Sequence, residues 1–342
     1  RNGNRHNYEY ALQVGVQGLE ASSEGPFKKG GKGSFLFNYR YSTMALIFPL
    51  LPEVNYSDEL PIYQDLSFKL NMPAGKAGTF SLWGIGGLSK STMKGSDEVE
   101  DWIYPENRER MRFNYNMGVS GLSHSKSLSK NTYLRTTLAW GGSEHIYNEK
   151  SRLDSLNPTR LVPLHHTQMK SARTNLTSRL THVFGSRFTL IAGIDASNHM
   201  YNLLGKARDY RNNDYNKIMD GSGNSWLMEG YLQGKYKLTS NLFLTAGLNT
   251  SWFEINRDHS IEPRLSASWQ LHPKHQFSLG YGNHSQIEPL FVYFVTATNN
   301  QSGEAWYPNK SLSRMGAHHF VLAYDWSIND NLRLKLEPYY QL

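Results

Sequence analysis

The chain has 342 residues, a formal net charge of +7 and no cysteine, so disulfides, thiol catalysis and cysteine-ligated metals are excluded. Its mean hydropathy is negative, and no stretch approaches the ~20 apolar residues that a membrane-spanning helix needs. Lys and Arg are scattered along the chain and form no run, which is typical of solvation, so we expect no nucleic-acid partner.

Alternation of apolar and polar residues predicts a series of antiparallel hairpins along the whole chain. In chain order the paired segments are 8–16 with 35–41, 66–70 with 80–82, 113–119 with 134–140, 176–180 with 188–194, 226–236 with 242–248, 265–269 with 277–281, and 320–328 with 332–336. The turns lie at residues 28–31, 74–76, 125–127, 185–186, 239–241, 272–274 and 329–331. Gly, Ser, Asn, Pro and Lys fill these turns, as short hairpins require. The pattern predicts about fourteen strands and no convincing helix.

The connections between hairpins are mostly long, and only the one near Arg257 is short. The long connections span residues 43–60, 89–110, 141–172, 199–224 and 284–316. If the strands run antiparallel in chain order, short turns lie at one end of the sheet and long loops at the other, as in outer-membrane barrels. A closed barrel also leaves no unpaired edge for lipid to meet. We therefore expect an all-β fold, an antiparallel transmembrane β-barrel whose apolar face meets lipid and whose polar face meets the lumen.

Aromatic residues near the ends of the expected strands fit this placement. Phe27, Trp140, Tyr339 and Tyr340 fall where the aromatic girdles of a barrel lie. Alternation alone leaves open a soluble β-sandwich or β-solenoid, which predicts neither long loops gathered at one end nor aromatic strand ends. An α/β enzyme fold is disfavoured because no crossover helices separate the strands.

The sequence contains no motif that indicates catalysis, a metal or a cofactor. His165 and His166 are adjacent, as are His318 and His319, but neighbours on a strand point to opposite faces, so neither pair can chelate together. The acidic residues of 97–101 lack the spacing and the glycine of a calcium loop. The glycines of LWGIGGLS (82–89) fall inside a predicted strand, where they indicate curvature or close packing and no nucleotide. We interpret the protein as a non-enzyme.

One connection combines aromatic and charged residues that could contact a ligand. Its candidate residues are Tyr201, Arg208, Asp209, Tyr210, Arg211 and Tyr215. An outward-facing loop of this kind could meet a glycan, a siderophore or a cobalamin-like molecule. It could equally hold lipopolysaccharide phosphates through Lys and Arg, or be a generic loop.

Several stretches resemble the barrel half of TonB-dependent outer-membrane receptors, especially the branch with an N-terminal carboxypeptidase-regulatory-like domain. They are GLEASSEGPF (18–27), GSFLFNYRYST (33–43), FSLWGIGGLS (80–89), EPRLSASWQLHPKHQFSLGYGNHSQIEPLFVYF (262–294), HHFVLAYDW (318–326) and LRLKLEPYYQ (332–341). They occur in the order typical of the family and cover nearly the whole chain. Each is a family-level pattern, so none identifies a substrate.

The resemblance implies a 22-stranded barrel around an N-terminal plug, with uptake driven by TonB, no cofactor and a place in the outer membrane. On this basis we expect residues 1–342 to be one partial barrel domain that lacks the plug, the signal peptide and the terminal strands. The expected partners are outer-membrane lipid and lipopolysaccharide, a small-molecule or oligosaccharide ligand, and the TonB complex through the plug. The expected function is active import of a bulky, scarce nutrient. A passive porin-type channel and a secreted β-rich glycan-binding or adhesin module remain the alternatives.

Overall fold

The structure is a computed structural model that describes residues 1–15, 18–42, 61–298 and 304–342. Within these residues, sixteen strands form one antiparallel sheet. In sequence order they are β1 (Glu9–Val14), β2 (Leu19–Pro26), β3 (Ser34–Tyr41), β4 (Ile62–Pro73), β5 (Thr79–Met93), β6 (Glu109–Ser127), β7 (Thr132–Arg152), β8 (Leu161–Phe184), β9 (Phe188–Arg208), β10 (Tyr215–Lys237), β11 (Leu242–Phe253), β12 (Asp258–His272), β13 (His275–Gln286), β16 (Met315–Asn329), β17 (Leu332–Leu336) and β18 (Tyr339–Gln341).

Short elements occupy some of the connections. They are η2 (Gly75–Ala77), η3 (Val99–Asp101), η4 (Pro105–Arg108), α2 (Leu290–Tyr293) and the two-residue strands β14 (Ala297–Thr298) and β15 (Ala305–Trp306), which pair with each other. Across the described residues, no helix has both the length and the apolar character needed to cross a membrane.

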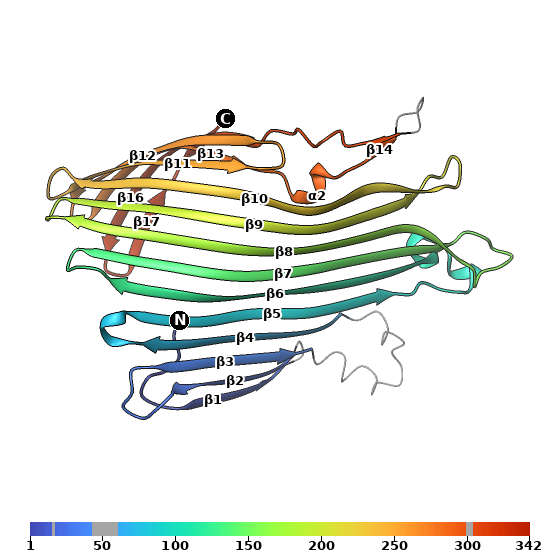
Figure 1. Cartoon of the computed structure of the whole chain (residues 1–342), viewed down its shortest axis with the longest axis horizontal. Coiled ribbons are helices and arrows are strands. Elements are labelled where there is room, and N and C mark those ends of the chain that lie inside the picture. Colours follow the sequence, from blue (N-terminus) through green and yellow to red (C-terminus); the bar gives the residue numbers. More distant parts are fainter. Residues whose placement is uncertain (16–17, 43–60, 299–303) are drawn as a thin grey trace.

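Neighbours in the sheet are neighbours in the chain. The order runs from β1 to β13 and continues through β16 to β17, while β18 pairs with β16. The sheet curls, so that β16 and β17 pass behind β8 to β10 (Figure 1). In the described part of the chain β1 does not pair with β17 or β18, and the sheet is therefore an open, curved wall.

The connections segregate to opposite ends of the sheet, as the sequence predicted. Residues 74–78, 128–131, 185–187, 238–241, 273–274 and 330–331 turn at one end, called here the short-turn end (left in Figure 1). Residues 94–108, 153–160, 209–214, 254–257 and 287–314 connect strands at the other, the long-loop end (right in Figure 1). The expected connection 43–60 lies outside the described residues.

Cross-strand register confirms that the alternating apolar residues share one face. Leu232 lies opposite both Ala192 and Leu248, and Leu279 lies opposite both Ala267 and Leu322. This face is called here the outward face, and no protein layer covers it in the described structure: Leu279 remains 61% exposed. The opposite, inward face of the same strands carries Glu229, Gln233 and Asn249. An uncovered face of this composition requires an apolar surrounding, which lipid provides.

The apolar part of the outward face has the height of a bilayer core. On β10 it extends from Trp226 in the middle of the strand to Tyr236 near the short-turn end, and β11 carries Trp252 opposite Met228. Ten residues of strand, tilted by about 40°, rise about 25 Å, the height of the apolar band of outer-membrane barrels. Beyond Trp226 the outward residues Asn224 and Ser222 are polar.

Strands β6 to β10 are much longer than the ~10 residues needed to cross a bilayer, since they contain 19 to 24 residues each. The predictions of loops at 141–172 and 199–224 are therefore wrong for most of their length: only 153–160 and 209–214 are connections. Outside the membrane an outward side chain need not be apolar, so alternation fades while backbone pairing continues. For the same reason Trp140 lies inside β7 and not at its end.

Three smaller differences have local causes. The sequence did not predict β2 and β18 as strands, because β2 is rich in Ser and Glu and β18 has three residues. The predicted pairing of 8–16 with 35–41 is therefore wrong: β2 lies between β1 and β3 and pairs with both. The third turn lies at 128–131 and not at 125–127, since Ser125, Lys126 and Ser127 all pair with β7. The remaining turns lie within a residue or two of the predicted positions.

Candidate functional site

The long connection between β13 and β16 folds back onto the inward face at the long-loop end. Its helix α2 places Tyr293 and the following Phe294 against Leu203 of β9, Met219 of β10 and Phe253 of β11. Phe253 and Tyr293 are completely buried. These five residues form the buried apolar cluster of the described chain, and they hold the connection against the wall by the burial of apolar surface.

Backbone pairing holds the same segment in register with β10. The amide of Asp220 donates to the carbonyl of Phe294 at 3.1 Å, and the amide of Thr296 donates to the carbonyl of Ile218 at 3.0 Å. The pairing of β10 with β11 ends at Leu227, so this edge of β10 is free to pair with the connection; β10 also has a register shift between Lys217 and Met219 in its pairing with β9. Gly221 has no side chain, and a Cβ atom there would overlap the ring of Phe294.

Arg314 fixes the far end of the connection. Its side chain is 9% exposed, and both its amide (2.9 Å) and its Nε (3.0 Å) donate to Oδ2 of Asp258. Its Nη1 donates to Ser251 and, at 3.3 Å, to Ser260. Burial opposes ionisation of Asp258, but the hydrogen bonds and charge of Arg314 hold the pKa of this carboxyl below its ordinary value. A buried pair with all its hydrogen bonds made resists separation.

A pocket of about 550 Å³ lies between the anchored connection and strands β9 and β10. Tyr201, Phe294 and Tyr307 supply aromatic faces: the rings of Tyr201 and Phe294 are 4.7 Å apart, and those of Phe294 and Tyr307 are 6.3 Å apart. The other lining residues are Asp220, Gly221, Ser222, Asn224, Ser225, Glu254, Ile255 and Lys310. Aromatic faces among carboxylates, hydroxyls and an ammonium group can stack on a ligand and hydrogen-bond to its edges.

Two buried polar atoms beside this pocket have no partner in the described structure. They are Nε2 of His199 and Oγ of Ser225, and the two residues lie opposite each other on β9 and β10. Ser225 lines the pocket. An unsatisfied buried polar group costs about 1–3 kcal/mol, so a partner for these two atoms, from a bound molecule or from another part of the protein that faces this wall, would be stabilising.

A second group of aromatic residues lines the inward face of β6 to β8 near the long-loop end. The rings of Phe113 and Tyr147 are 4.9 Å apart, and those of Tyr147 and His165 are 5.5 Å apart. Tyr147 Oη donates to Glu149 at 2.8 Å, and Tyr115 lies 5.8 Å from the ring of His145. Sequence reasoning missed this group, because its members come from three strands and meet only through the register.

The structure separates the six ligand-contact candidates. Tyr201, in β9, lines the pocket, but Arg208, also in β9, donates to the carbonyls of Pro163 (2.9 Å) and Asn213 (2.7 Å). Asp209 accepts from the amide of Arg211 at 2.9 Å, so it shapes its own turn. Tyr210 and Arg211 are exposed at the tip of that turn, and Tyr215 begins β10. Only Tyr201 thus reaches the pocket, since the expected long loop is two paired strands.

The histidines and acids singled out in the sequence have separate local partners. His165 contacts Tyr147 on the inward face, whereas Nδ1 of His166 lies 2.7 Å from Asn148 Oδ1 on the outward face. Asp97 accepts from Nε of the buried Arg152 at 2.7 Å. Among the described residues, no three His, Asp or Glu side chains are grouped to hold a metal ion.

Comparisons with known proteins agree with the geometry. The model of the family described as TonB dependent receptor-like, beta-barrel matches residues 63–341. No curated protein matches the sequence.

Solved structures share the fold at low identity. The ferric yersiniabactin uptake receptor FyuA from Yersinia pestis is 10% identical with a TM-score of 0.68, over 99% of this chain and 55% of that one. The ferric-catecholate import receptor Fiu from K12 E. coli is 10% identical with a TM-score of 0.66, over 99% and 58%. The copper transporter OprC is 13% identical with a TM-score of 0.64, over 100% and 55%. The chain therefore spans a little more than half the length of these proteins.

Proposed function

This chain belongs to the TonB-dependent receptor-like β-barrel family, and from that premise we propose that it forms part of an outer-membrane receptor that imports a bulky, scarce nutrient with energy from TonB. The family is one of transport receptors. The observation that carries the proposal is the pocket at the long-loop end, where Tyr201, Phe294 and Tyr307 meet on the inward face. A pocket in this place can capture a solute before it enters the lumen.

The two ends of the sheet have different surroundings in this proposal. The long-loop end faces the outside of the cell and the short-turn end faces the periplasm, as in other outer-membrane barrels. The remaining strands of the receptor close the wall, and a plug fills the lumen, which in a barrel of about 22 strands is too wide for side chains to fill. The plug would meet the polar inward face around His199 and Glu229 and carry the contact to TonB.

The pocket supports a ligand with both ring faces and polar edges. Glu254 supplies a carboxylate there, and Lys310, whose Nζ lies 5.6 Å from the centre of the Tyr307 ring, can donate hydrogen bonds. A small-molecule chelate or an oligosaccharide has this combination of features. FyuA, Fiu and OprC are named for ferric yersiniabactin, ferric catecholates and copper, which is in line with the first of these classes.

The test is ligand binding by the purified full-length receptor, screened against ferric siderophores, cobalamin and oligosaccharides by intrinsic tryptophan fluorescence. We expect a double Tyr201→Ala, Tyr307→Ala variant to bind the selected ligand at least ~10-fold more weakly, because each lost ring contact contributes on the order of 1 kcal/mol. Tyr210→Ala, at the exposed tip of the neighbouring turn, is the matched control and should leave affinity unchanged.

Energy coupling separates the receptor from a passive channel. Uptake of the labelled ligand by cells should stop when TonB is deleted, while binding to the cell surface persists. Uptake that continues without TonB would contradict the proposal and favour a porin-type channel.

A further inference from the structure

A groove of about 710 Å³ crosses the outward face of β4 to β7. Its floor is a row of three glycines that lie opposite one another on neighbouring strands, Gly86, Gly118 and Gly142. Leu66 of β4 and Ala172 of β8 continue the row on either side. Because each of these three adjacent strands has a glycine at this position, a channel is left in a face that otherwise carries large apolar residues.

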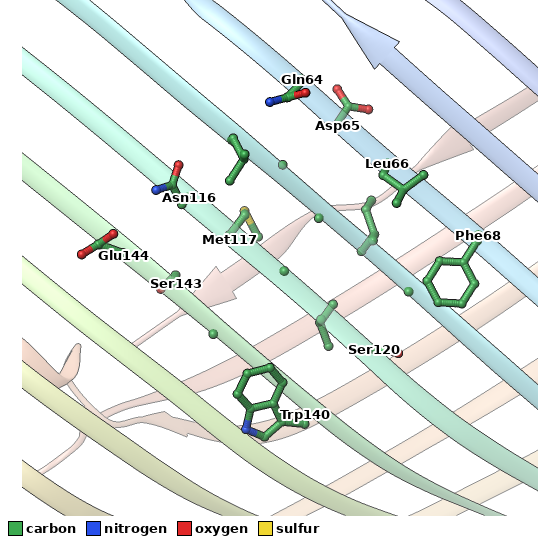
Figure 2. A pocket seen from close by; sticks show the side chains of 18 of the residues that line it. Gln64, Asp65, Leu66, Phe68, Asn116, Met117, Ser120, Trp140, Ser143 and Glu144 are labelled. Atoms are coloured by element: carbon green, nitrogen blue, oxygen red, sulfur yellow. The ribbon is translucent and has the colours of Figure 1, made fainter.

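Large side chains border this floor toward the short-turn end. Phe68 and Trp140 stand on opposite sides of the groove, with Ser120 between them (Figure 2). The Phe68 ring covers Gly84, where a Cβ atom would lie 2.6 Å from the ring. Toward the long-loop end the border is polar and consists of Gln64, Asn116 and Glu144 (Figure 2). The groove thus runs from an apolar end to a polar end along the lipid-facing wall.

Positive charge begins where the groove becomes polar. Lys90 follows Leu88 on the same face of β5, and Arg112 is its diagonal neighbour on β6, since Lys90 lies opposite Asn114. Lys170 lies opposite Glu144 and pairs with it at 3.1 Å. Lys90 and Arg112 are exposed, and no acidic side chain is paired with either in the described part of the chain.

Two further cations extend this charge toward the long-loop end. Arg110 and Lys150 lie directly opposite each other on the outward face of β6 and β7. Like charges in such positions repel, so an anion between them would be stabilising. The carboxylates at the same level, Glu109 and Glu149, occur at odd positions and therefore on the inward face. Charge is therefore separated across this wall, with cations toward the membrane side.

We propose that this groove and the cations above it bind one molecule of a phosphorylated glycolipid from the outer leaflet. An acyl chain lies on Gly86, Gly118 and Gly142, and its phosphates meet Lys90 and Arg112, with Arg110 and Lys150 available to a second phosphate. Apolar contact with the chain and charge complementarity with the phosphates act together, as in basic sites for lipid headgroups. The inference rests on the membrane placement in the proposed function and gives the lipid partner a specific site on this wall.

A second outward groove provides the internal comparison. It has about 890 Å³ and is lined by residues of β9 to β13, among them Leu232, Ala246 and Leu265. The charged residues of β10 nearest to it, Lys235 and Lys237, have odd positions and lie on the inward face. It offers an apolar surface of similar size without the adjoining cations, so it should hold acyl chains without preference for phosphate.

The experiment measures binding of diphosphoryl and monophosphoryl lipid A to the full-length receptor by native mass spectrometry. We expect the wild type to prefer the diphosphoryl form. The double variant Lys90→Gln, Arg112→Gln should lose this preference, with an affinity for diphosphoryl lipid A lower by about 10- to 30-fold. Gly118→Leu should weaken both forms equally by filling the groove; a Cβ atom at Gly118 has 3.7 Å to its nearest neighbours, so the fold tolerates it.

Two control variants match these changes. Lys130→Gln removes a cation at the short-turn end, and Ala246→Leu adds a similar bulk to the second groove; both variants should bind diphosphoryl lipid A within twofold of the wild type. Equal affinity of the wild type and the Lys90/Arg112 double variant would overturn the inference. Heat-modifiable migration and nutrient binding, measured on the same samples, report the proposed function separately: a receptor that inserts and binds nutrient but shows no phosphate preference refutes only the lipid site.

Discussion

At the scale of single residues, glycines and one arginine decide the shape of the candidate site. Gly221 leaves the space that the Phe294 ring occupies, and Arg314 ties the end of the same connection to Asp258. Together with the burial of Tyr293 and Phe294, these two residues hold the described part of the connection on the inward face, and they offset a cost of about 1–2 kcal/mol for each residue that is ordered. The pocket is therefore a consequence of how this connection is anchored.

This anchoring gives a prediction at the level of one methyl group. Gly221→Ala should displace Phe294 and weaken docking of the connection by about 1–3 kcal/mol, as for an overpacked site. Limited proteolysis of the receptor in detergent should then cleave within residues 287–314 faster than in the wild type. Gly280→Ala is the matched control, because a Cβ atom at Gly280 meets nothing within 4 Å. Equal cleavage in both variants would mean that the Phe294 contact does not anchor the connection.

At the scale of strands, the composition of the outward face changes along the strand, from apolar in the membrane to charged near the long-loop end. Between Trp226 and Tyr236 the outward face of β10 is apolar or glycine, while the inward face carries Glu229, Gln233 and Lys235. Nearer the long-loop end, the outward face of β5 to β7 carries cations instead. Each strand thus continues from lipid into water without a break in backbone pairing, and only the change from apolar to polar outward side chains marks the membrane surface.

Position within the apolar band sets the cost of a buried charge. Leu248 lies opposite Leu232 near the middle of the band, whereas Leu244 lies opposite Tyr236 at its edge. Leu248→Lys should therefore lower the free energy of unfolding by about 2–4 kcal/mol, and Leu244→Lys by about 0–1 kcal/mol. Leu334, opposite Trp326 close to the short-turn end, should resemble Leu244.

The inward face supplies the control for this series. Gln233→Lys, on the polar side of the same strand pair, should change the unfolding free energy least. Equilibrium unfolding of the receptor from phospholipid vesicles measures all four variants. Similar, small losses at Leu248 and Gln233 would show that the outward face does not meet hydrocarbon.

At the scale of the whole molecule, the chain is a curved wall that needs further strands to close. The described strands pair in sequence order, and the wall has an edge at β1 and another at β17 and β18. An unpaired edge is not tolerated in lipid, so in the receptor that we propose further strands cover both edges. Relatives of similar fold have chains nearly twice as long.

The segregated connections predict which end of this wall is outside. An epitope inserted after Tyr210, in connection 209–214, should bind antibody on intact cells, whereas one inserted after Ser240, in turn 238–241, should bind only after the outer membrane is opened. Short turns of outer-membrane barrels face the periplasm. The opposite pattern of labelling would reverse the orientation and move the pocket of Tyr201 and Tyr307 to the periplasmic side.

The sequence predicted the strands inside the membrane far better than those beyond it. Hairpins such as 226–236 with 242–248 are confirmed because lipid requires an apolar residue at every second position. For the extensions of β7 to β10 the sequence predicts loops, because the two faces of these extensions do not differ in solvent and the side chains therefore do not alternate. The candidate site is predicted least well from the sequence. The sequence indicates Tyr201, but Phe294 and Tyr307 lie about a hundred residues away and meet it only in three dimensions.

The amino-acid sequence by itself determined the all-β fold, the antiparallel order and the face that meets lipid, because these follow from period-two alternation and from turn chemistry, which are local. Only the tertiary structure decided where the β13–β16 connection docks, which aromatic residues line a common pocket, and that three glycines align beside a row of cations. These features depend on cross-strand register and on contacts between distant segments. A local pattern carries no information about either, since the residues involved are neighbours only after the sheet has formed.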